Sequence, residues 1–304
     1  MNLRDLQYIV ALAEHGHHGK AARACHVSQP TLSGQIAKLE AELGIAIFQK
    51  LGRTIGLTEA GEAIIVHART ALAAAHDIAE TARAHKDPLS GRLRIGVIPT
   101  LGPYLMPYVL PLAAEQLPDA PLALIEDLTG HLIPLVSEGK LDAALIATTD
   151  FPPELASIDL FDEPFWVVTP ANHPLLVNKS LRTSDLDPAS LLLLTDGHCL
   201  RDQALDLCGH APAGNKAMAD MRATSLETLL HLTAADYGVT LAPQLAIECG
   251  RANTDQLAFR PLEGKGTQRR VRLIFRRSSP RAKALIELAR VVRAALPESV
   301  QPLG

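Results

Sequence analysis

Two cysteines, Cys199 and Cys208, are the residues of this sequence best suited to redox chemistry. The apolar run 191–194 predicts a buried strand and the spacing after Cys199 is helical, so this cysteine falls where a strand gives way to a helix. A helix N-terminus carries a partial positive charge, and His198 and Arg201 are near enough to add to it. Because positive charge lowers the pKa of a thiol, the sequence predicts a nucleophilic thiolate at Cys199.

The spacing of the two cysteines conflicts with a disulfide between them. On one continuous helix, nine residues turn through about 900° and separate the two positions by roughly 13 Å along the axis. A disulfide tolerates a Cα separation of only about 4.4–6.8 Å. Pairing would therefore require the segment to unwind. The alternative is two inert buried thiols, a common place for free cysteine. The neighbouring Gly197, His198 and Arg201 would be unusual company for a passive residue.

The composition describes an ordinary globular protein. The chain has 304 residues, of which 47% are hydrophobic and 20% charged, and this length predicts two or three domains. No run of about 18 apolar residues occurs and no signal peptide precedes the first amphipathic pattern, so we expect a cytoplasmic protein without a membrane partner.

The four cysteines are too few and too scattered for a structural disulfide framework. In a reducing compartment any disulfide among them should be transient and regulatory. The sequence has neither a CxxC nor an HExxH motif, so we expect no metal and no other cofactor.

The N-terminal stretch reads as a helix-turn-helix. Helical spacing from Leu3 to about Gly16 is followed by a short helix from Lys20 to Cys25 and by a third helix that Ser28 caps. The second helix of such a motif enters the DNA major groove. Its outward residues would be Gln29, Pro30, Thr31, Ser33, Gln35 and Lys38. A small helical bundle with a polar face is the alternative that the pattern leaves open.

Residues 45–58 read as a short hairpin with Arg53 at its tip. An arginine on such a wing suits a narrow minor groove, where negative potential is concentrated. The net charge of -4 argues weakly against nucleic acid, but between Gly19 and Arg53 five basic residues outnumber two acidic ones. This local excess is compatible with phosphate contact.

A long helix follows, capped by Thr58 and extending to about His85. One row of small and apolar residues steps by four and three positions along it: Ile64, Ala68, Ala71, Ala75, Ile78 and Ala82. A single helix cannot bury such a seam, so we expect pairing between subunits, with packing onto its own domain as the alternative. The segment 87–91 then breaks the helix and forms a hinge.

From Arg92 onward strands alternate with helices, which predicts an α/β domain with a largely parallel sheet covered by helices. A second half begins near Phe165 and contains the cysteine segment. The stretch from Arg269 to Arg276 returns to the first half before a final helix.

Motifs across the whole chain resemble those of the LysR-type transcriptional regulators. In the first domain they are Val27-Ser28-Gln29-Pro30-Thr31-Leu32-Ser33 and Leu57-Thr58-Glu59-Ala60-Gly61. The resemblance implies a winged helix-turn-helix, a linker helix and a two-lobed effector domain like the periplasmic binding proteins. The expected boundaries are 1–58, 59–91 and 92–304, with lobe I at about 92–163 and 268–304 and lobe II at about 164–267.

The effector domain resembles the peroxide-sensing activators of that family. The similarity lies in Asp196-Gly197-His198-Cys199-Leu200-Arg201-Asp202-Gln203, Cys208, Ile98-Pro99-Thr100 and Arg222-Ala223-Thr224-Ser225. It implies that Cys199 reacts with peroxide and that Cys208 resolves the product as a disulfide. The residues that would bind or activate peroxide are Thr100, Thr129, His198, Gly197 and Arg201.

A regulator of this kind implies hydrogen peroxide as effector and double-stranded promoter DNA as ligand. Further implied partners are other copies of the chain in a homodimer or homotetramer, RNA polymerase, and a thioredoxin- or glutaredoxin-type reductant. Two alternatives stay open. A regulator with a small organic co-inducer in the cleft would be indifferent to Cys199→Ser, whereas a thiol peroxidase would consume peroxide continuously and would leave the first domain unexplained.

Overall fold

The computed structural model describes residues 1–52, 54–208, 222–249 and 255–303. Two compact units divide the chain within its longest helix, Met1–Ala82 and Arg83–Gly304, and each is described by itself. Each unit has its own core of buried apolar residues. Most of the expected linker segment therefore belongs to the first unit.

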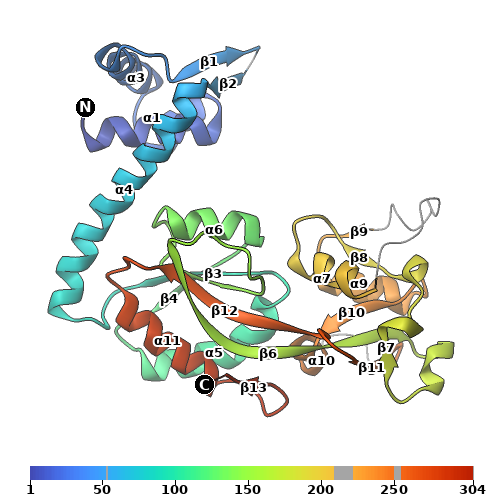
Figure 1. Ribbon diagram of the computed structural model, residues 1–304. Helices are drawn as coiled ribbons and strands as arrows, with labels where there is room; N and C mark the ends of the chain where they lie inside the picture. The colour runs from blue at the N-terminus through green and yellow to red at the C-terminus, as the bar shows by residue number, and fades with distance from the viewer. Residues whose placement is uncertain (53, 209–221, 250–254, 304) are drawn as a thin grey trace. The chain divides into compact units, whose positions relative to one another are not determined.

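The first unit is the expected helix-turn-helix with a hairpin (Figure 1). Asn2 caps α1, and Gly16 and Gly44 end α1 and α3 in the left-handed conformation that glycine adopts without a Cβ clash. The predicted N-cap at Ser28 is confirmed, because its hydroxyl accepts from the Thr31 backbone N–H at 3.2 Å. The elements are α1 Leu3–His15, α2 His18–Ala24, α3 Gln29–Leu43, β1 Phe48–Leu51 and β2 Thr54–Leu57.

Helix α4 spans Glu59–Lys86, as the sequence predicts. The Thr58 hydroxyl accepts from the Gly61 N–H at 2.9 Å and so caps it. Of the apolar seam, Ala68 lies in the core of the first unit, whereas Ile78 is 73% exposed. The seam thus leaves this unit's core before the helix ends.

The second unit contains a mixed sheet in the order β4-β3-β5-β12-β6-β11-β7, with β10 also paired to β6. Among the described strands of this sheet, the pairs of β3 with β4 and β5 and of β11 with β7 are parallel, and β8 and β9 form a separate parallel pair; β6 and β12 run antiparallel to their neighbours. The expectation of a largely parallel sheet is therefore wrong. The parallel pairs of the first lobe come from its βαβ units, while β6 and β12 are long strands that pass between two lobes (Figure 1).

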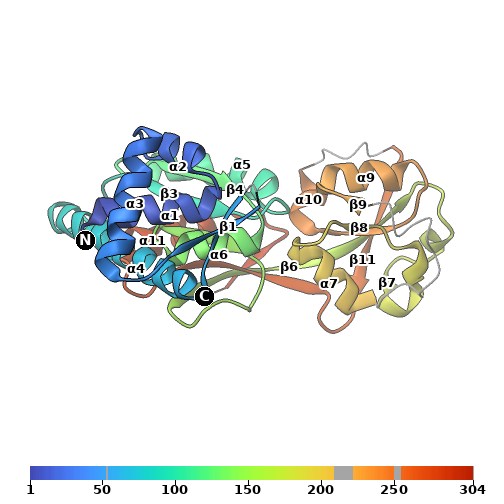
Figure 2. The same cartoon turned by 90° about the horizontal axis from the view of Figure 1, so that it is seen from above.

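The first lobe follows the predicted alternation of strands and helices. Helix α6 covers one face of its sheet, and α5 and α11 cover the other (Figures 1 and 2). The elements are β3 Leu93–Val97, α5 Gly102–Gln116, β4 Leu122–Glu126, α6 Thr129–Ser137, β5 Ala143–Ile146, β12 Gln268–Arg276 and α11 Ala282–Ala294, with the short β13 Gln301–Pro302 paired to β6.

The second lobe is built around the C-terminal part of β6, a strand that spans Leu155–Pro170. One uninterrupted strand joins the lobes because its first part pairs with β12 and its last part with β10 and β11. Within the predicted strand 191–194, Leu191 forms a bridge to Val239, and Leu193–Leu194 form the short strand β8. The elements are β7 Leu181–Arg182, β8 Leu193–Leu194, α7 Cys199–Cys208, β9 Arg222–Ala223, α9 Leu226–Ala234, β10 Thr240–Pro243, α10 Gln244–Glu248 and β11 Leu257–Glu263, with short 3-10 helices over 174–177, 183–185 and 188–190.

Candidate functional site

A small pocket between the two lobes brings together most of the residues predicted to bind or react with peroxide. The empty space between its lining atoms, part of it open to solvent, is about 150 Å³. The loop between β3 and α5 and the start of α6 form one side, and the turn that enters α7 forms the other. Its lining residues are Ile98, Pro99, Thr100, Leu128, Thr129, Gly197, His198 and Cys199. Residues about 70 to 100 positions apart in the sequence thus share one wall.

The two cysteines mark the ends of one helix. Cys199 is the first and Cys208 the last residue of the ten-residue α7, and both are free thiols. At a rise of about 1.5 Å per residue, their Cα atoms are about 13 Å apart, well beyond the reach of a disulfide. The spacing conflict inferred from the sequence is therefore present in the folded protein.

The Cys199 thiol is less acidic than the sequence predicts. Burial raises its pKa, and this effect outweighs the opposing influences of the Arg269 guanidinium, the Thr129 hydroxyl and the Leu200 backbone N–H. Asp202 raises the pKa further. The prediction of a low pKa was wrong because it counted nearby charge and not the loss of water around the sulfur.

The positive charge near Cys199 also comes from a different residue. Arg201 pairs instead with Asp196, its Nη2 atom 3.0 Å from Oδ1, and Arg201 is absent from the pocket wall. His198 is buried, and burial lowers its pKa, so its imidazole is neutral at physiological pH. Arg269, on β12, is the cation that acts on the sulfur.

Sequence reasoning missed Arg269 because it is 70 residues away and is only one of several arginines in β12. Its side chain is fully buried and pairs with the equally buried Glu163, with Nε 2.8 Å from Oε2. Its other nitrogens donate to Thr100, Nη1 to Oγ1 and Nη2 to the carbonyl oxygen, both at 2.9 Å. A buried cation is tolerated here because every one of these donors meets an acceptor.

Thr100 and Thr129 both present a hydroxyl group to the pocket, but the two groups differ in their hydrogen bonding. Arginine can only donate, so the Thr100 oxygen accepts from Arg269 and its own proton is free to point elsewhere. The Thr129 Oγ1 is buried without a hydrogen-bond partner at normal distance among the described residues, although it is close enough to lower the pKa of Cys199. The pocket therefore offers two hydroxyls beside the sulfur.

Gly197 has a structural reason to be glycine. Its φ of 95° lies in the left-handed region, and a Cβ there would stand 3.0 Å from Leu128 Cδ1 across the pocket. Glycine thus lets the chain turn into α7 while the lobes stay in contact.

A second contact ties α7 to the first lobe. The Gln203 Nε2 donates to the Ala147 carbonyl oxygen at 2.7 Å. Gln203 lies one turn after Cys199, between the two cysteines. The sequence motif contained this residue but did not predict the contact, because the acceptor is a backbone group 56 positions away.

In the first unit, most of the predicted DNA-contact residues lie on the surface of α3. Gln29, Pro30, Thr31, Gln35 and Lys38 are exposed. Ser33 is only partly exposed, and its hydroxyl is 3.1 Å from His18 Nδ1, so it bonds within the protein. Arg53 lies outside the described residues.

Neither a metal centre nor a membrane span is found in the described part of the chain. Within it, no three His, Cys, Asp or Glu side chains gather as they would around a metal ion. None of the described helices combines the length and the apolar character needed to cross a bilayer.

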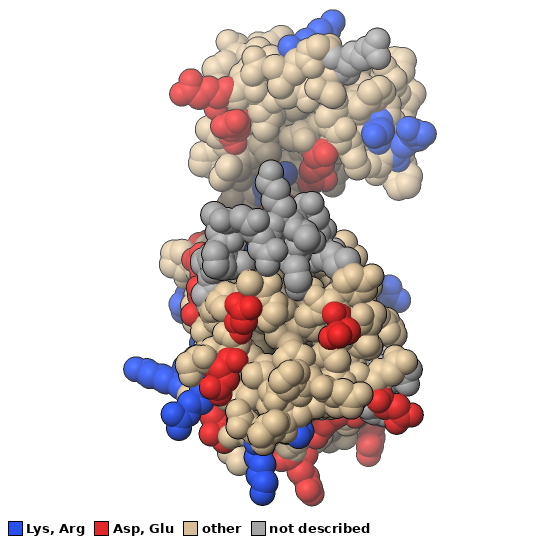
Figure 3. Space-filling view, turned by 90° about the vertical axis from the view of Figure 1, so that its right-hand side faces the viewer, with Lys and Arg blue, Asp and Glu red and all other residues tan. Residues whose placement is uncertain are grey.

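On the face drawn in Figure 3, basic and acidic side chains are scattered among uncharged ones.

Comparison with known protein families gives two matches that together cover most of the chain. Residues 3–62 match the bacterial regulatory helix-turn-helix protein, lysR family, and residues 86–297 match the LysR substrate binding domain. The DNA-binding transcriptional dual regulator OxyR of Escherichia coli K12 is 40% identical over 294 residues, which are 97% of this chain and 95% of that protein. The hydrogen peroxide-inducible genes activator of Haemophilus influenzae is 39% identical over 92% of each chain.

Solved structures agree. A full-length mutant of OxyR from Pseudomonas aeruginosa superposes with a TM-score of 0.76 at 38% identity, covering 96% of this chain and 95% of that one. A hydrogen-peroxide-bound mutant of Corynebacterium glutamicum OxyR has a TM-score of 0.64 at 35% identity, covering 97% and 92%. With its winged helix-turn-helix and two-lobed effector domain, this chain belongs to the LysR family of bacterial transcriptional regulators.

Proposed function

We propose that this chain is a DNA-binding transcriptional activator that senses hydrogen peroxide and is switched by a disulfide between Cys199 and Cys208. The observation that carries the proposal is the pocket that joins the Cys199 thiol to two threonine hydroxyls, with Cys208 at the far end of the same helix. Relatives about 40% identical over almost the whole chain are named as hydrogen peroxide-inducible activators, which supports the same function.

The first chemical step takes place in the pocket. The Cys199 thiolate attacks one oxygen of hydrogen peroxide; a sulfur–oxygen bond forms, the O–O bond breaks, and the departing hydroxide takes a proton to leave as water. The Thr100 hydroxyl, whose oxygen accepts from Arg269, donates its proton toward the peroxide. Thr129 supplies a second hydroxyl, and His198 and Gly197 shape the wall around the reacting oxygen. Arg269 takes the charge-stabilising role first expected of Arg201.

The second step converts this local change into a change of fold. The Cys208 thiolate attacks the sulfenic sulfur of Cys199, so a sulfur–sulfur bond forms and the sulfur–oxygen bond breaks with release of water. The sum is two thiols and one peroxide giving one disulfide and two waters. Because α7 holds the sulfurs apart, the helix must unwind and the contact of Gln203 with the first lobe must break. A thioredoxin- or glutaredoxin-type dithiol resets the switch by exchange.

The remaining partners follow from the first unit and from α4. The exposed residues of α3, above all Gln29, Gln35 and Lys38, contact double-stranded promoter DNA. Arg53 lies outside the described residues, and its contact with the minor groove stays an expectation from the sequence. The apolar seam of α4, in which Ile78 is exposed, pairs subunits into a homodimer, and two dimers form a homotetramer that engages RNA polymerase. A cytoplasmic location keeps the thiols reduced at rest.

The test is mass spectrometry under non-reducing conditions after treatment with micromolar peroxide, combined with DNA binding to a target promoter. We expect a peptide that links Cys199 to Cys208, and we expect Cys199→Ser to abolish the response to peroxide. Absence of that peptide together with normal regulation by Cys208→Ser would rule out the disulfide switch. Normal regulation by Cys199→Ser would favour a small organic co-inducer, and sustained peroxide consumption with a dithiol donor would favour a thiol peroxidase.

A further inference from the structure

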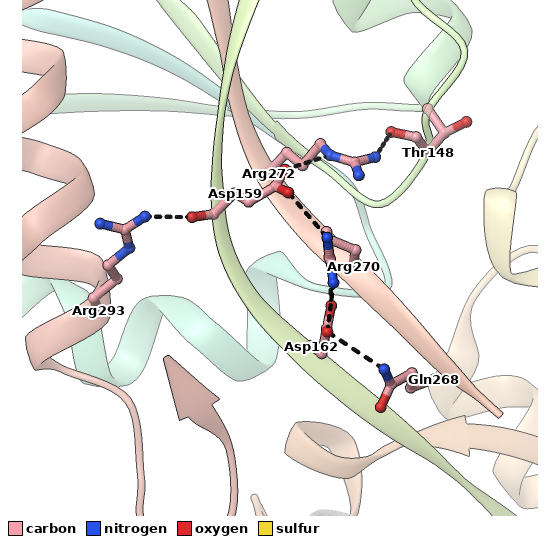
Figure 4. A network of polar contacts seen from close by, with 7 residues as sticks. All are labelled: Thr148, Asp159, Asp162, Gln268, Arg270, Arg272 and Arg293. Atoms are coloured by element: carbon pink, nitrogen blue, oxygen red, sulfur yellow. Dashed lines mark hydrogen bonds and ion pairs between the residues drawn. The ribbon is translucent and has the colours of Figure 1, made fainter. Parts of the chain in front are cut away.

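Two ion pairs cross from β6 to β12 at neighbouring positions and face opposite sides of the sheet. Asp162 stands opposite Arg270, and Glu163 stands opposite Arg269. The outer pair is partly exposed and belongs to a surface network with Asp159 and Arg272 (Figure 4). The inner pair is completely buried. Alternation along the strands thus places one carboxylate in solvent and the next in the core.

The inner carboxylate has two partners on two different elements. One oxygen of Glu163, Oε2, accepts from Arg269 Nε at 2.8 Å. The other, Oε1, accepts from the backbone N–H of Leu245 at 2.9 Å, in the first turn of α10. Arg269 in turn donates twice to Thr100, at the wall of the sensing pocket. An unbroken chain of hydrogen bonds therefore runs from α10 in the second lobe to the pocket.

The energy of a buried ion pair does not explain this arrangement. Removing two charges from water offsets most of their attraction, so apolar residues would stabilise the fold at least as well. What the pair provides is a fixed direction for the guanidinium. Without the carboxylate, a buried guanidinium is uncompensated and turns toward water, which takes it away from Thr100.

We propose that Glu163 is a positioning residue for the reaction of Cys199, holding Arg269 so that it donates to Thr100 and faces the sulfur. The inference rests on the peroxide-sensing function proposed above and assigns a role to a residue that does not line the pocket. Glu163 acts only through Arg269, since its two oxygens are occupied by Arg269 and Leu245.

A competing role predicts the opposite pH dependence. The charged groups that act on the Cys199 thiol are Arg269 from β12 and Asp202 from its own helix, while the adjacent His198 is neutral. If Glu163 only neutralised Arg269, its removal would leave an extra positive charge, lower the pKa of Cys199 and speed the reaction. If Glu163 positions Arg269, its removal withdraws that charge, so the pKa stays or rises and the reaction slows.

The experiment measures the second-order rate constant for oxidation of Cys199 by hydrogen peroxide in the reduced full-length protein between pH 6 and 10. Glu163→Gln keeps the volume of the side chain but removes its charge and turns one acceptor into a donor. Asp162→Asn is the matched control, because it makes the same charge change one residue away on the outer face. Glu163→Asp keeps the charge but is too short to reach both partners, and it decides the question if Glu163→Gln does not fold.

For Glu163→Gln we expect a rate at neutral pH that is lower by about ten-fold or more, as for loss of a charge-assisted hydrogen bond. The pH at which this variant reaches half of its maximal rate should be the same as in the wild type or higher. Glu163→Asp should lose less of the rate, and Asp162→Asn should react at the wild-type rate. A faster reaction with a lower midpoint, or rates within two-fold of the wild type for both Glu163 variants, would overturn the inference while leaving the peroxide function intact. A wild-type protein that does not react with peroxide would overturn both.

Discussion

The stability of helix α7 should oppose formation of the Cys199–Cys208 disulfide. A substitution at a single exposed residue of α7 should therefore change the reduction potential of that disulfide. Asp206 is exposed on α7, so replacing it with alanine or glycine changes the backbone preference and little packing. Both variants lose the same carboxylate. The comparison of Asp206→Ala with Asp206→Gly therefore isolates helix propensity at this position.

The size of the effect follows from the geometry of α7. The ten-residue helix separates Cys199 from Cys208 by about 13 Å, and a disulfide needs about 4.4–6.8 Å, so the helix must be lost on oxidation. Glycine in a helix costs about 1 kcal/mol relative to alanine, and this cost falls on the reduced form alone. Since 30 mV corresponds to about 1.4 kcal/mol for a two-electron couple, the glycine variant should have a reduction potential about 20 mV more negative than the alanine variant.

The assay equilibrates each variant with a graded dithiothreitol redox buffer, quenches by alkylation and quantifies the Cys199–Cys208 peptide by mass spectrometry. The control is the pair Arg290→Ala and Arg290→Gly, at an exposed position in the middle of α11. This pair should differ in unfolding free energy but not in potential. Potentials for the two Asp206 variants that agree within about 5 mV would refute the claim that α7 unwinds when the disulfide forms.

Three further predictions concern the reduced form. Gly197→Ala should lower the free energy of unfolding by about 1–2 kcal/mol in urea, because alanine is strained at a φ of 95° and its Cβ meets Leu128; an unchanged stability would contradict this. Gln203→Met should cost about 1 kcal/mol in the same assay and speed disulfide formation from the sulfenic acid, because the bond to the Ala147 carbonyl is lost, and slower formation would argue against it. Burial raises the pKa of Cys199 above its ordinary value of 9.0, so the rate of reaction with peroxide should still be rising with pH at pH 9. A rate that reaches its plateau near pH 7 would instead show a stabilised thiolate and contradict this prediction.

Much of the first unit could be read from local sequence signals. Ser28 caps α3 and Thr58 caps α4 as predicted, because a hydroxyl three residues before an unpaired backbone N–H acts within one turn. Individual side chains were less predictable. Ser33 was predicted to contact DNA, but its hydroxyl bonds to His18. His18 belongs to another helix, so its proximity could not be read from the local sequence.

In the second unit the local helices and strands were predictable, but the direction of several strands was not. The alternation from Arg92 onward suggested a largely parallel sheet, whereas β6 and β12 are antiparallel to their neighbours. The pattern of apolar residues reports that a strand is buried and not which way its partner runs.

The sequence by itself determined how far apart Cys199 and Cys208 stand if they share one helix, since helical rise depends only on the number of residues between them, and the structure shows that helix. It also identified Thr100, Thr129, Gly197 and His198, which the folded chain brings into one pocket. Only the tertiary structure decided the electrostatics of that pocket. Arg269 replaces Arg201 as the neighbouring cation, Glu163 fixes its direction, and burial raises the pKa of Cys199. These effects depend on distance through space and on exclusion of water, neither of which follows from position along the chain.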